Sequence, residues 1–491
     1  MDQSSILPKL KEVVRHSAIY GVGSVLQTLV GFILIPLYTK HYTTDIYGVF
    51  SLLTLCGTLA GAIFYLGGSS ALSRFYYEYP DADGRRKVIG NCFTITIVGA
   101  CIQILLGVLF CRQISGWLFD SQRYALHVAV VLGSYSIMFI NGYFLLLLRF
   151  ARKSLQVVAI NLVGFVSGIA FIVYFLLGLK LGVLAPVLGD LCNQLLLCAL
   201  LYWVTREDVC LQVTRSELIP QLKYGLPIVL AGLAYYLLAW TDRLLLKHFA
   251  TMSDVGIYSL GYRLGTSINI LLIIPFSQIW APMRMQYRND VLVLQLYKKV
   301  LTYYFVIGVV ITAGVGVFSN EIVVVLARNT DYRAAAGVIP LIMLAYLLFG
   351  SVNIIDVGIA ISRRTMWHVY IYGVCIVVNA VLNMALISRY GALGAAWTAL
   401  ATFGLLVVLV FLVSNHFFRL EVEFGRLGRL LLGVLMVLGI SQQIPSVSLA
   451  AITVKCGLML CLLGFIGTWV LSADEREKLA GIIRGLALRV G

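Results

Sequence analysis

Long apolar stretches alternate with short polar connections along the whole chain. Each stretch runs for about 20 residues, the length that a helix needs to cross the hydrocarbon core of a membrane. A helix also satisfies its backbone polar groups internally, which lipid cannot do. The pattern predicts fourteen transmembrane spans, near residues 17–39, 46–70, 88–111, 125–148, 156–178, 183–204, 224–246, 255–280, 299–319, 334–360, 369–388, 393–414, 428–444 and 449–471.

The two halves of the chain look duplicated. Residues 40–52 and 247–260 carry the same turn with one inserted residue, at an offset of 207 from His41 to His248. A second pair, Gly182 and Gly391, has an offset of 209. An even number of spans per copy leaves both copies in the same orientation, as in parallel-repeat transporters. We therefore expect two pseudo-symmetric six-helix lobes around a central cavity, with the last two spans outside the duplication.

This organisation predicts five segments. Leu7, Leu10 and Val14 recur at helical spacing beside basic residues, which is typical of an amphipathic helix on a membrane surface. The expected segments are an amphipathic N-terminal helix at 1–16, an N-lobe at 17–210, a C-lobe at 216–427, two further helices at 428–471 and a tail at 472–491.

Composition narrows the class of protein. The 491 residues are 60% hydrophobic and only 12% charged, whereas soluble domains are about 25% charged. A water-soluble enzyme, a disordered protein and a fibrous protein are therefore excluded. The net charge of +15 includes no run of five basic residues, so we expect no nucleic-acid partner. The ten cysteines form no C-x-x-C pair, and neither a zinc site nor a disulfide framework is expected.

The charges predict an orientation. Of the 37 Lys and Arg residues, 26 fall on one side of the predicted membrane and 8 on the other. Because basic loops stay in the cytoplasm, both termini are predicted to be cytoplasmic.

No enzyme signature is present. The chain has neither a Walker loop nor an H-E-x-x-H motif. Asp81 and Asp83 form an Asp-x-Asp sequence, which we interpret as part of a solvated turn. The longest predicted outer connection, 320–333, has 14 residues, which disfavours a membrane polysaccharide polymerase or glycosyltransferase.

Polar residues inside the spans indicate where a substrate would bind. Span 8 places Tyr258, Tyr262 and Asn269 on one face, together with Arg263. A charge at mid-membrane costs about 2.5–3.5 kcal/mol even on the mildest scale, so a functional role is favoured. Span 2 also carries polar and small residues, and for these residues helix–helix packing is the alternative to a place in a substrate cavity.

Acidic residues in the spans predict gating or ion coupling. Asp242 lies near the outer end of span 7, roughly 7 Å deep, and Arg263 roughly 12 Å deep on span 8. We expect an Asp242–Arg263 pair that acts as an outer gate, with a salt bridge or a ligand role as alternatives. Asp190 and Asp356 are the other buried acids, and Asp356 also lies close enough to 363–364 to pair there.

Four short motifs occur in a characteristic order along the chain: Arg74-Phe75-Tyr76-Tyr77-Glu78-Tyr79, Trp240-Thr241-Asp242-Arg243-Leu244, Val255-Gly256-Ile257-Tyr258-Ser259-Leu260-Gly261-Tyr262-Arg263, and Tyr390-Gly391-Ala392-Leu393-Gly394-Ala395-Ala396-Trp397. Their order and spacing resemble the MOP flippase superfamily, in particular the Wzx-type polysaccharide (O-antigen) transporters.

This resemblance implies a function. It implies that undecaprenyl-pyrophosphate-linked oligosaccharide is flipped across the bacterial inner membrane by alternating access, in a cationic cavity lined by spans 1, 2, 7 and 8. In related peptidoglycan-precursor flippases an Arg-Leu on span 8 contacts pyrophosphate, and Arg263-Leu264 matches it. Ser259 stands where that pattern has tyrosine.

The resulting candidate sites have two roles. The candidate substrate-binding residues are Arg263, Arg243, Tyr258, Tyr262, Asn269, Tyr20, Gln27, Arg15 and Arg74, and the candidate gating or ion-coupling residues are Asp242, Asp190 and Asp356. No cofactor or metal is expected, and coupling to protons or sodium is left open. The expected partners are the polyprenyl-linked glycan, membrane lipids and other polysaccharide-assembly proteins. A MATE-type ion-coupled exporter of small molecules is the main alternative.

Overall fold

The computed structural model describes residues 31–76, 78–79, 81–209, 213–278, 280, 293–327, 329–362, 364, 366–444 and 448–477. Within these residues the secondary structure consists of helices joined by short turns, with no strand. The predicted all-α fold class is confirmed.

Twelve described helical stretches are long and apolar enough to cross a membrane. One of them, Met366–Phe417, contains two predicted spans joined at Gly391, whose φ of 53° lies in the left-handed region that suits glycine. Each predicted span from the second to the fourteenth thus has a helical counterpart. The first span and the segment 1–16 lie largely or wholly outside the described residues, as does most of the tail. The chain is a multi-pass membrane protein.

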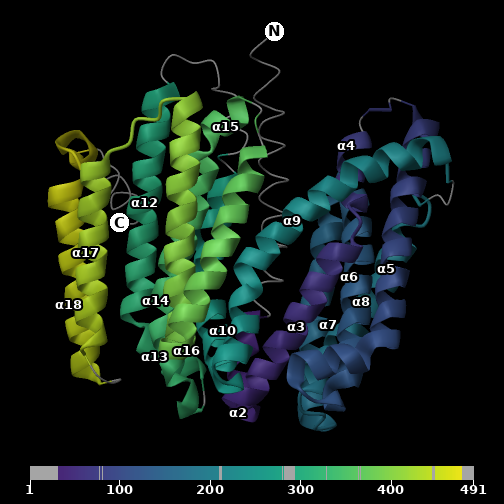
Figure 1. Ribbon diagram of the computed structural model, residues 1–491, viewed down its shortest axis with the longest axis horizontal. Coiled ribbons are helices and arrows are strands. Elements are labelled where there is room, and N and C mark those ends of the chain that lie inside the picture. Colours follow the sequence, from purple (N-terminus) through teal and green to yellow (C-terminus); the bar gives the residue numbers. More distant parts are fainter. Residues whose placement is uncertain are drawn as a thin grey trace, which may run out of the picture. The chain divides into compact units, whose positions relative to one another are not determined.

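The chain divides into two compact units, Met1–Ser259 and Leu260–Gly491. In the first unit, α5, α6 and α8 lie side by side, with α7 against α8 (Figure 1). Its helices are α2 (Ile35–His41), α3 (Thr44–Phe64), α4 (Gly68–Phe75), α5 (Ala82–Phe119), α6 (Ala125–Phe150), α7 (Ser154–Val173), α8 (Leu184–Thr205), α9 (Arg215–Phe249) and the start of α10 (Met252–Gly265), with the short turns η2 (Gln122–Tyr124) and η3 (Tyr174–Gly178). The lobe boundary expected at 210–216 stays a prediction.

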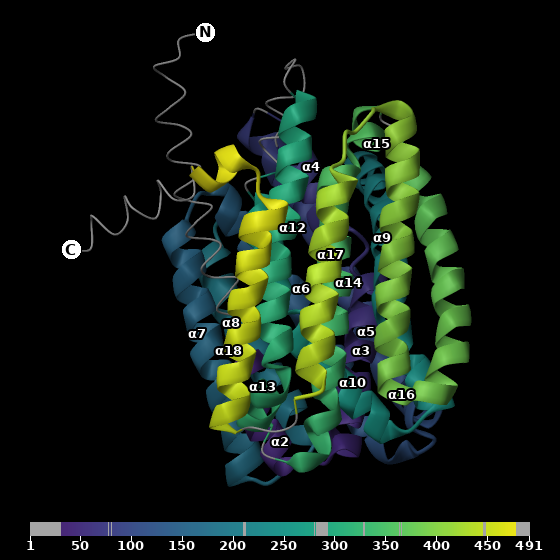
Figure 2. The same cartoon turned by 90° about the vertical axis from the view of Figure 1, so that its left-hand side faces the viewer.

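The second unit is built around α14. This helix packs against α12 and α16, and α17 packs against α12 (Figure 2). The elements are the rest of α10, η4 (Asn269–Ile273), α12 (Val293–Val317), α13 (Ser319–Leu326), η5 (Thr330–Ala334), α14 (Ala335–Ile355), α15 (Val357–Ile361), α16 (Met366–Phe417), α17 (Phe424–Gln442), α18 (Leu449–Phe465) and η6 (Ile466–Val470).

The last two spans are joined to the second unit near both of their ends. Lys455 of α18, which is fully buried, donates to both carboxylate oxygens of Glu321 on α13, at 2.7 and 2.9 Å. Near the other end, Glu475 accepts hydrogen bonds from Tyr303 of α12 at 3.0 Å and from Arg426 of α17 at 3.4 Å. These contacts make α17 and α18 part of the packed unit, although they lie outside the duplication.

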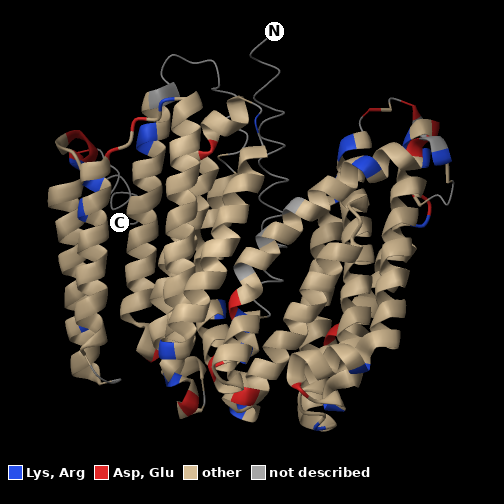
Figure 3. Ribbon diagram, in the orientation of Figure 1, with Lys and Arg blue, Asp and Glu red and all other residues tan. Residues whose placement is uncertain are grey.

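Charged residues gather near the helix ends and leave the middles of most helices uncharged (Figure 3). Asp81 belongs to such an end, because it accepts a hydrogen bond from the Gly84 amide at 2.7 Å and caps α5. This hydrogen bond lowers the pKa of Asp81. Asp81 therefore has a local structural role.

Candidate functional site

The two copies of the duplicated turn start two helices in the same way. Thr43 caps α3 by accepting from the Ile46 amide at 3.5 Å. Thr251, 208 residues later, accepts from the Asp254 amide at 3.1 Å, and Asp254 accepts from the Thr251 amide at 3.2 Å. This reciprocal pair is a capping box for α10.

The two helices then cross in direct backbone contact inside the first unit. A Cβ added to Gly256 of α10 would lie 1.9 Å from the carbonyl oxygen of Thr44, and one added to Gly48 of α3 would lie 2.3 Å from that of Met252. Gly48 and Gly256 are equivalent positions of the two copies, again 208 residues apart. Only glycine at both positions permits so close a crossing.

A buried serine pair continues the crossing. Ser51 and Ser259, also equivalent positions, share a hydrogen bond of 2.6 Å between their Oγ atoms. Thr44 and Ser253 share another of 2.7 Å. The crossing is therefore a close, approximately two-fold contact between the first halves of α3 and α10.

Arg243 of α9 is buried beside this crossing, with 3% of its surface exposed. Its Nε donates to Ser259 Oγ at 3.3 Å, and its guanidinium carbon lies 4.5 Å from the centre of the Trp240 ring and 5.5 Å from that of Tyr258. Desolvated contacts between a cation and an aromatic ring are worth about 2 kcal/mol or more. Aromatic faces and a hydroxyl thus hold a charge that the apolar surroundings would otherwise disfavour.

Asp242, the neighbour of Arg243, is equally buried and accepts a hydrogen bond of 2.7 Å from the Tyr258 hydroxyl. The structure therefore brings together three of the predicted site residues, Asp242, Arg243 and Tyr258. They form one polar cluster where α9 and α10 meet, which we call the α9–α10 cluster. Ser259 connects this cluster to the crossing with α3.

The predicted Asp242–Arg263 pair remains a prediction, since the two residues belong to different units. Arg263 is half-buried on the second part of α10. Next to it, the buried Tyr262 shares a hydrogen bond with the Tyr346 hydroxyl of α14. Asn269 begins the short turn η4.

The remaining predicted residues are spread along the chain. Arg15, Tyr20 and Gln27 lie outside the described residues. Arg74 of α4 is exposed, pairs with Glu78 at 3.6 Å and lies 4.8 Å from the centre of the Tyr224 ring. Asp356 joins α14 to α15.

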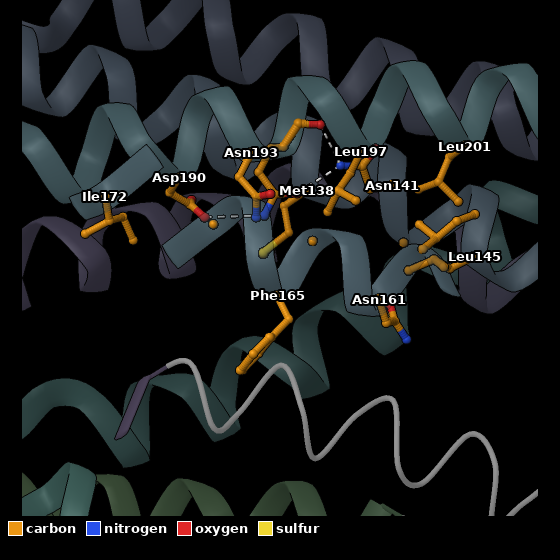
Figure 4. Close-up of a pocket in the computed structure, with 15 residues that line it drawn as sticks. Met138, Asn141, Leu145, Asn161, Phe165, Ile172, Asp190, Asn193, Leu197 and Leu201 are labelled. Atoms are coloured by element: carbon orange, nitrogen blue, oxygen red, sulfur yellow. Dashed lines mark hydrogen bonds between the residues drawn. The ribbon is translucent and has the colours of Figure 1, made fainter. Parts of the chain in front are cut away.

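Asp190 lies in a pocket of about 340 Å³ between α6, α7 and α8 of the first unit, where a few polar side chains face a mostly apolar lining (Figure 4). One carboxylate oxygen accepts from Ser134 of α6, and the other accepts from Gln194 Nε2 at 3.5 Å. Asn141 donates to both the backbone and the side-chain oxygen of Gln194, each at 2.9 Å. We call this group the α6–α8 pocket.

Glycines of α7 bring α8 close enough to form the pocket wall. A Cβ on Gly168 would lie 3.0 Å from Asn193 Nδ2, and one on Gly164 would lie 2.9 Å from Leu197. Asn193 accepts a hydrogen bond from Ser167 at 2.7 Å across the same interface. Small residues four apart thus give this helix pair both close packing and polar contact.

Sequence reasoning found Asp190 but not its amide neighbours. Asn141, Asn193 and Gln194 are single polar residues in apolar spans, and each on its own is typical of helix packing. The usable signal was the spacing of Asp190, Asn193 and Gln194 on one face of α8. Among the described residues, no group of three His, Cys, Asp or Glu side chains could hold a metal ion.

These features define a class of protein: an all-helical multi-pass membrane protein with a duplicated core and buried charged residues in its spans. Residues 13–288 match the family model of the polysaccharide biosynthesis proteins. Since the match covers more than half of the chain, the chain belongs to the polysaccharide biosynthesis protein family. The resemblance stated from the sequence is confirmed.

Comparison with known proteins supports the same grouping. Lsg locus putative protein 1 of Haemophilus influenzae is 25% identical over 276 residues, which are 53% of this chain and 63% of the relative. The match therefore spans less than two thirds of that relative.

Two solved structures show the fold. The lipid II flippase MurJ in an inward closed conformation has a TM-score of 0.75 at 12% identity, covering 91% of this chain and 98% of its own. An inward-facing multidrug resistance MATE transporter of the MOP superfamily has a TM-score of 0.65 at 14% identity, covering 82% and 95%. The likeness shows that the chain shares the fold of these two transporters.

Proposed function

We propose that the protein flips polyprenyl-pyrophosphate-linked oligosaccharide from the cytoplasmic to the outer leaflet of the bacterial inner membrane, as a step in polysaccharide assembly. The family membership and the MurJ-like fold support a transporter of this kind. Undecaprenyl pyrophosphate is the carrier that the resemblance implies. The protein acts by alternating access and not as an enzyme.

The α9–α10 cluster carries the proposal. It holds Arg243 buried among aromatic rings, and the same helix α10 presents Arg263 five residues beyond Tyr258. A diphosphate is too strongly hydrated to cross hydrocarbon unaided, so its water must be replaced by fixed cationic donors. Arginine suits this task because it stays charged and offers a bidentate fork to phosphate oxygens.

The two arginines have different roles in this proposal. Arg243 is enclosed by its neighbours and positions α10, whereas the half-buried Arg263 contacts the pyrophosphate. In this proposal the other substrate-binding residues are Tyr262, Asn269, Tyr20, Gln27, Arg15 and Arg74. The membrane potential assists, since each negative charge moved outward gains about 2.3 kcal/mol per 100 mV.

Substitution of Arg263 tests this assignment. We expect Arg263→Ala to abolish flipping of a labelled lipid-linked glycan in reconstituted vesicles while insertion and folding persist. Arg263→Lys should restore part of the rate, because a point charge lacks the bidentate fork. Arg112→Ala on α5, which removes an exposed arginine, is the matched control and should flip normally. A wild-type rate for Arg263→Ala would make Arg263 a structural residue.

A MATE-type exporter of small molecules is the second candidate, favoured by the fold likeness to such transporters. The two candidates differ in substrate. An exporter would extrude cationic dyes from loaded vesicles and leave lipid-linked glycan in place. A flippase would move the lipid-linked glycan and leave the dyes inside the vesicles. Asp242, Asp190 and Asp356 serve gating or ion coupling in either case.

A further inference from the structure

The α6–α8 pocket holds a carboxylate, that of Asp190, to which the proposed function gives a gating or ion-coupling role without naming a ligand. Asp190 is bonded to Ser134 and Gln194 and forms no ion pair with any residue that the structure describes. Its helix, α8, is one of the helices that are long and apolar enough to span the membrane. A lone carboxylate there is costly unless a cation or a proton neutralises it.

A second group in the pocket points to a cation. Asn141 is 3% exposed, and its Oδ1 has no hydrogen-bond partner among the residues that the structure describes. The orientation of this amide follows from its contacts, because its Nδ2 donates to two oxygens of Gln194. The acceptor Oδ1 is therefore directed away from Gln194 and lacks a donor. A buried amide oxygen in this state costs about 1–3 kcal/mol unless a ligand satisfies it.

The surrounding atoms are oxygen donors of the type that hard cations prefer. Asp190, Asn141 and Asn193 line the pocket with carboxylate and amide oxygens (Figure 4), and the Ser134 hydroxyl donates to the Asp190 carboxylate. Carboxylate, amide and hydroxyl oxygens suit alkali and alkaline-earth ions, whereas softer metals prefer sulfur or imidazole. One carboxylate balances one positive charge, which favours a monovalent ion over a divalent one.

The second repeat provides an internal comparison. There, Asn379 of α16 donates to Thr402 at 3.3 Å, whereas Ser167 donates to Asn193 in the first repeat. Asn379 lies 212 residues after Ser167, so only the acceptors of the two contacts, Asn193 and Thr402, are at equivalent positions. The offset of 209 that relates Gly182 to Gly391 also relates Asn193 to Thr402. The same offset places Ala399 opposite Asp190. The polar helix pair is thus present in both repeats, but only the first adds an acid at this position.

We propose that the α6–α8 pocket binds a monovalent alkali cation, with Na⁺ as the probe, through Asp190 and the free oxygen of Asn141. The pocket of about 340 Å³ has room for an ion that keeps part of its water, since one water occupies about 30 Å³. Binding in this pocket is independent of the substrate. Its use to drive transport rests on the proposed flippase function.

The binding test uses the purified full chain in detergent. Thermal unfolding is followed in NaCl, KCl and choline chloride at constant ionic strength. We expect Na⁺ to raise the Tm in a saturable manner, because a ligand that binds only the folded state stabilises it. Asp190→Asn, which preserves the shape and removes the charge, should abolish this rise. Asn141→Leu should weaken the apparent Na⁺ affinity about tenfold, equivalent to about 1.4 kcal/mol.

Asn379→Leu, in the second repeat, where Ala399 stands at the position equivalent to Asp190, is the matched control and should keep the full Na⁺ effect. A Tm that does not depend on Na⁺, or that depends only on pH, would overturn the proposal. Loss of the Na⁺ effect in Asn379→Leu but not in Asp190→Asn would also overturn it. Size-exclusion profiles in choline chloride establish that each variant is folded before its Na⁺ response is compared.

The same preparation separates this proposal from the proposed function. A chain that binds Na⁺ through Asp190 but flips no lipid-linked glycan would refute the flippase function and leave the cation site standing. A chain that flips the glycan but shows no Na⁺-dependent Tm would refute the site and leave the flippase function intact.

Discussion

A buried charge is stable only when neighbouring groups compensate for its lost hydration, and the α9–α10 cluster provides such groups for two charges. The Arg243 guanidinium lies against two aromatic rings and bonds Ser259, while Asp242 accepts from Tyr258. Tyr258 serves both charges, with its ring for the arginine and its hydroxyl for the aspartate. This dual role makes Tyr258 the residue most sensitive to a small change.

Tyr258→Phe tests that dual role. The substitution keeps the ring over Arg243 but removes the hydroxyl that donates to the buried Asp242 carboxylate, so we expect a loss of about 1–3 kcal/mol of stability. The midpoint of thermal unfolding in detergent should fall accordingly. Tyr202→Phe, whose side chain is exposed on α8, is the control and should leave the midpoint unchanged. An equal midpoint for both variants would show that the hydroxyl is unimportant.

At the scale of elements, the crossing of α3 with α10 links the duplication to the proposed transport cycle. Equivalent glycines let the helices touch, and equivalent serines bond across the contact. Both helices are expected to line the cavity, so alternating access requires this contact to separate. A covalent bond at Ser51 and Ser259 should therefore stop transport.

The double variant Ser51→Cys/Ser259→Cys, made without the native cysteines, provides the measurement. The Oγ atoms lie 2.6 Å apart, close to the S–S distance of about 2.0 Å. We expect an oxidant to form the disulfide and stop flipping, and a reductant to restore it. Ser51→Cys alone should be insensitive to oxidation. Wild-type flipping by the crosslinked protein would show that the crossing does not open.

At the scale of the whole molecule, the apolar pattern was sufficient to predict the second to fourteenth spans, and the similar turns at 40–52 and 247–260 indicated the duplication. It could not reveal that the two copies meet at Gly48 and Gly256, because a repeat in sequence does not specify contact. Nor could it identify Asn141 as a candidate ligand, because the pocket that Asn141 lines forms only where α6, α7 and α8 pack together. The sequence pattern also gives no sign of the buried Lys455–Glu321 ion pair, because the two residues lie 134 positions apart.

Orientation in the membrane is a property of the whole chain, and the distribution of Lys and Arg predicts it. Reporter fusions after residue 330 should read as outside the cytoplasm, and fusions after residue 365 as inside. Both termini should be cytoplasmic. The reverse pattern would contradict the fourteen-span topology and the direction of the proposed transport.

The central claim is that the protein moves a lipid carrying a pyrophosphate-linked glycan. The most direct measurement reconstitutes the wild-type protein in vesicles and follows the accessibility of a fluorescent polyprenyl-pyrophosphate glycan over time. A matched polyprenyl glycan without the pyrophosphate, and vesicles without protein, are measured in parallel. The account predicts fast movement of the pyrophosphate lipid only, and only with protein present. Movement no faster than in protein-free vesicles would contradict it.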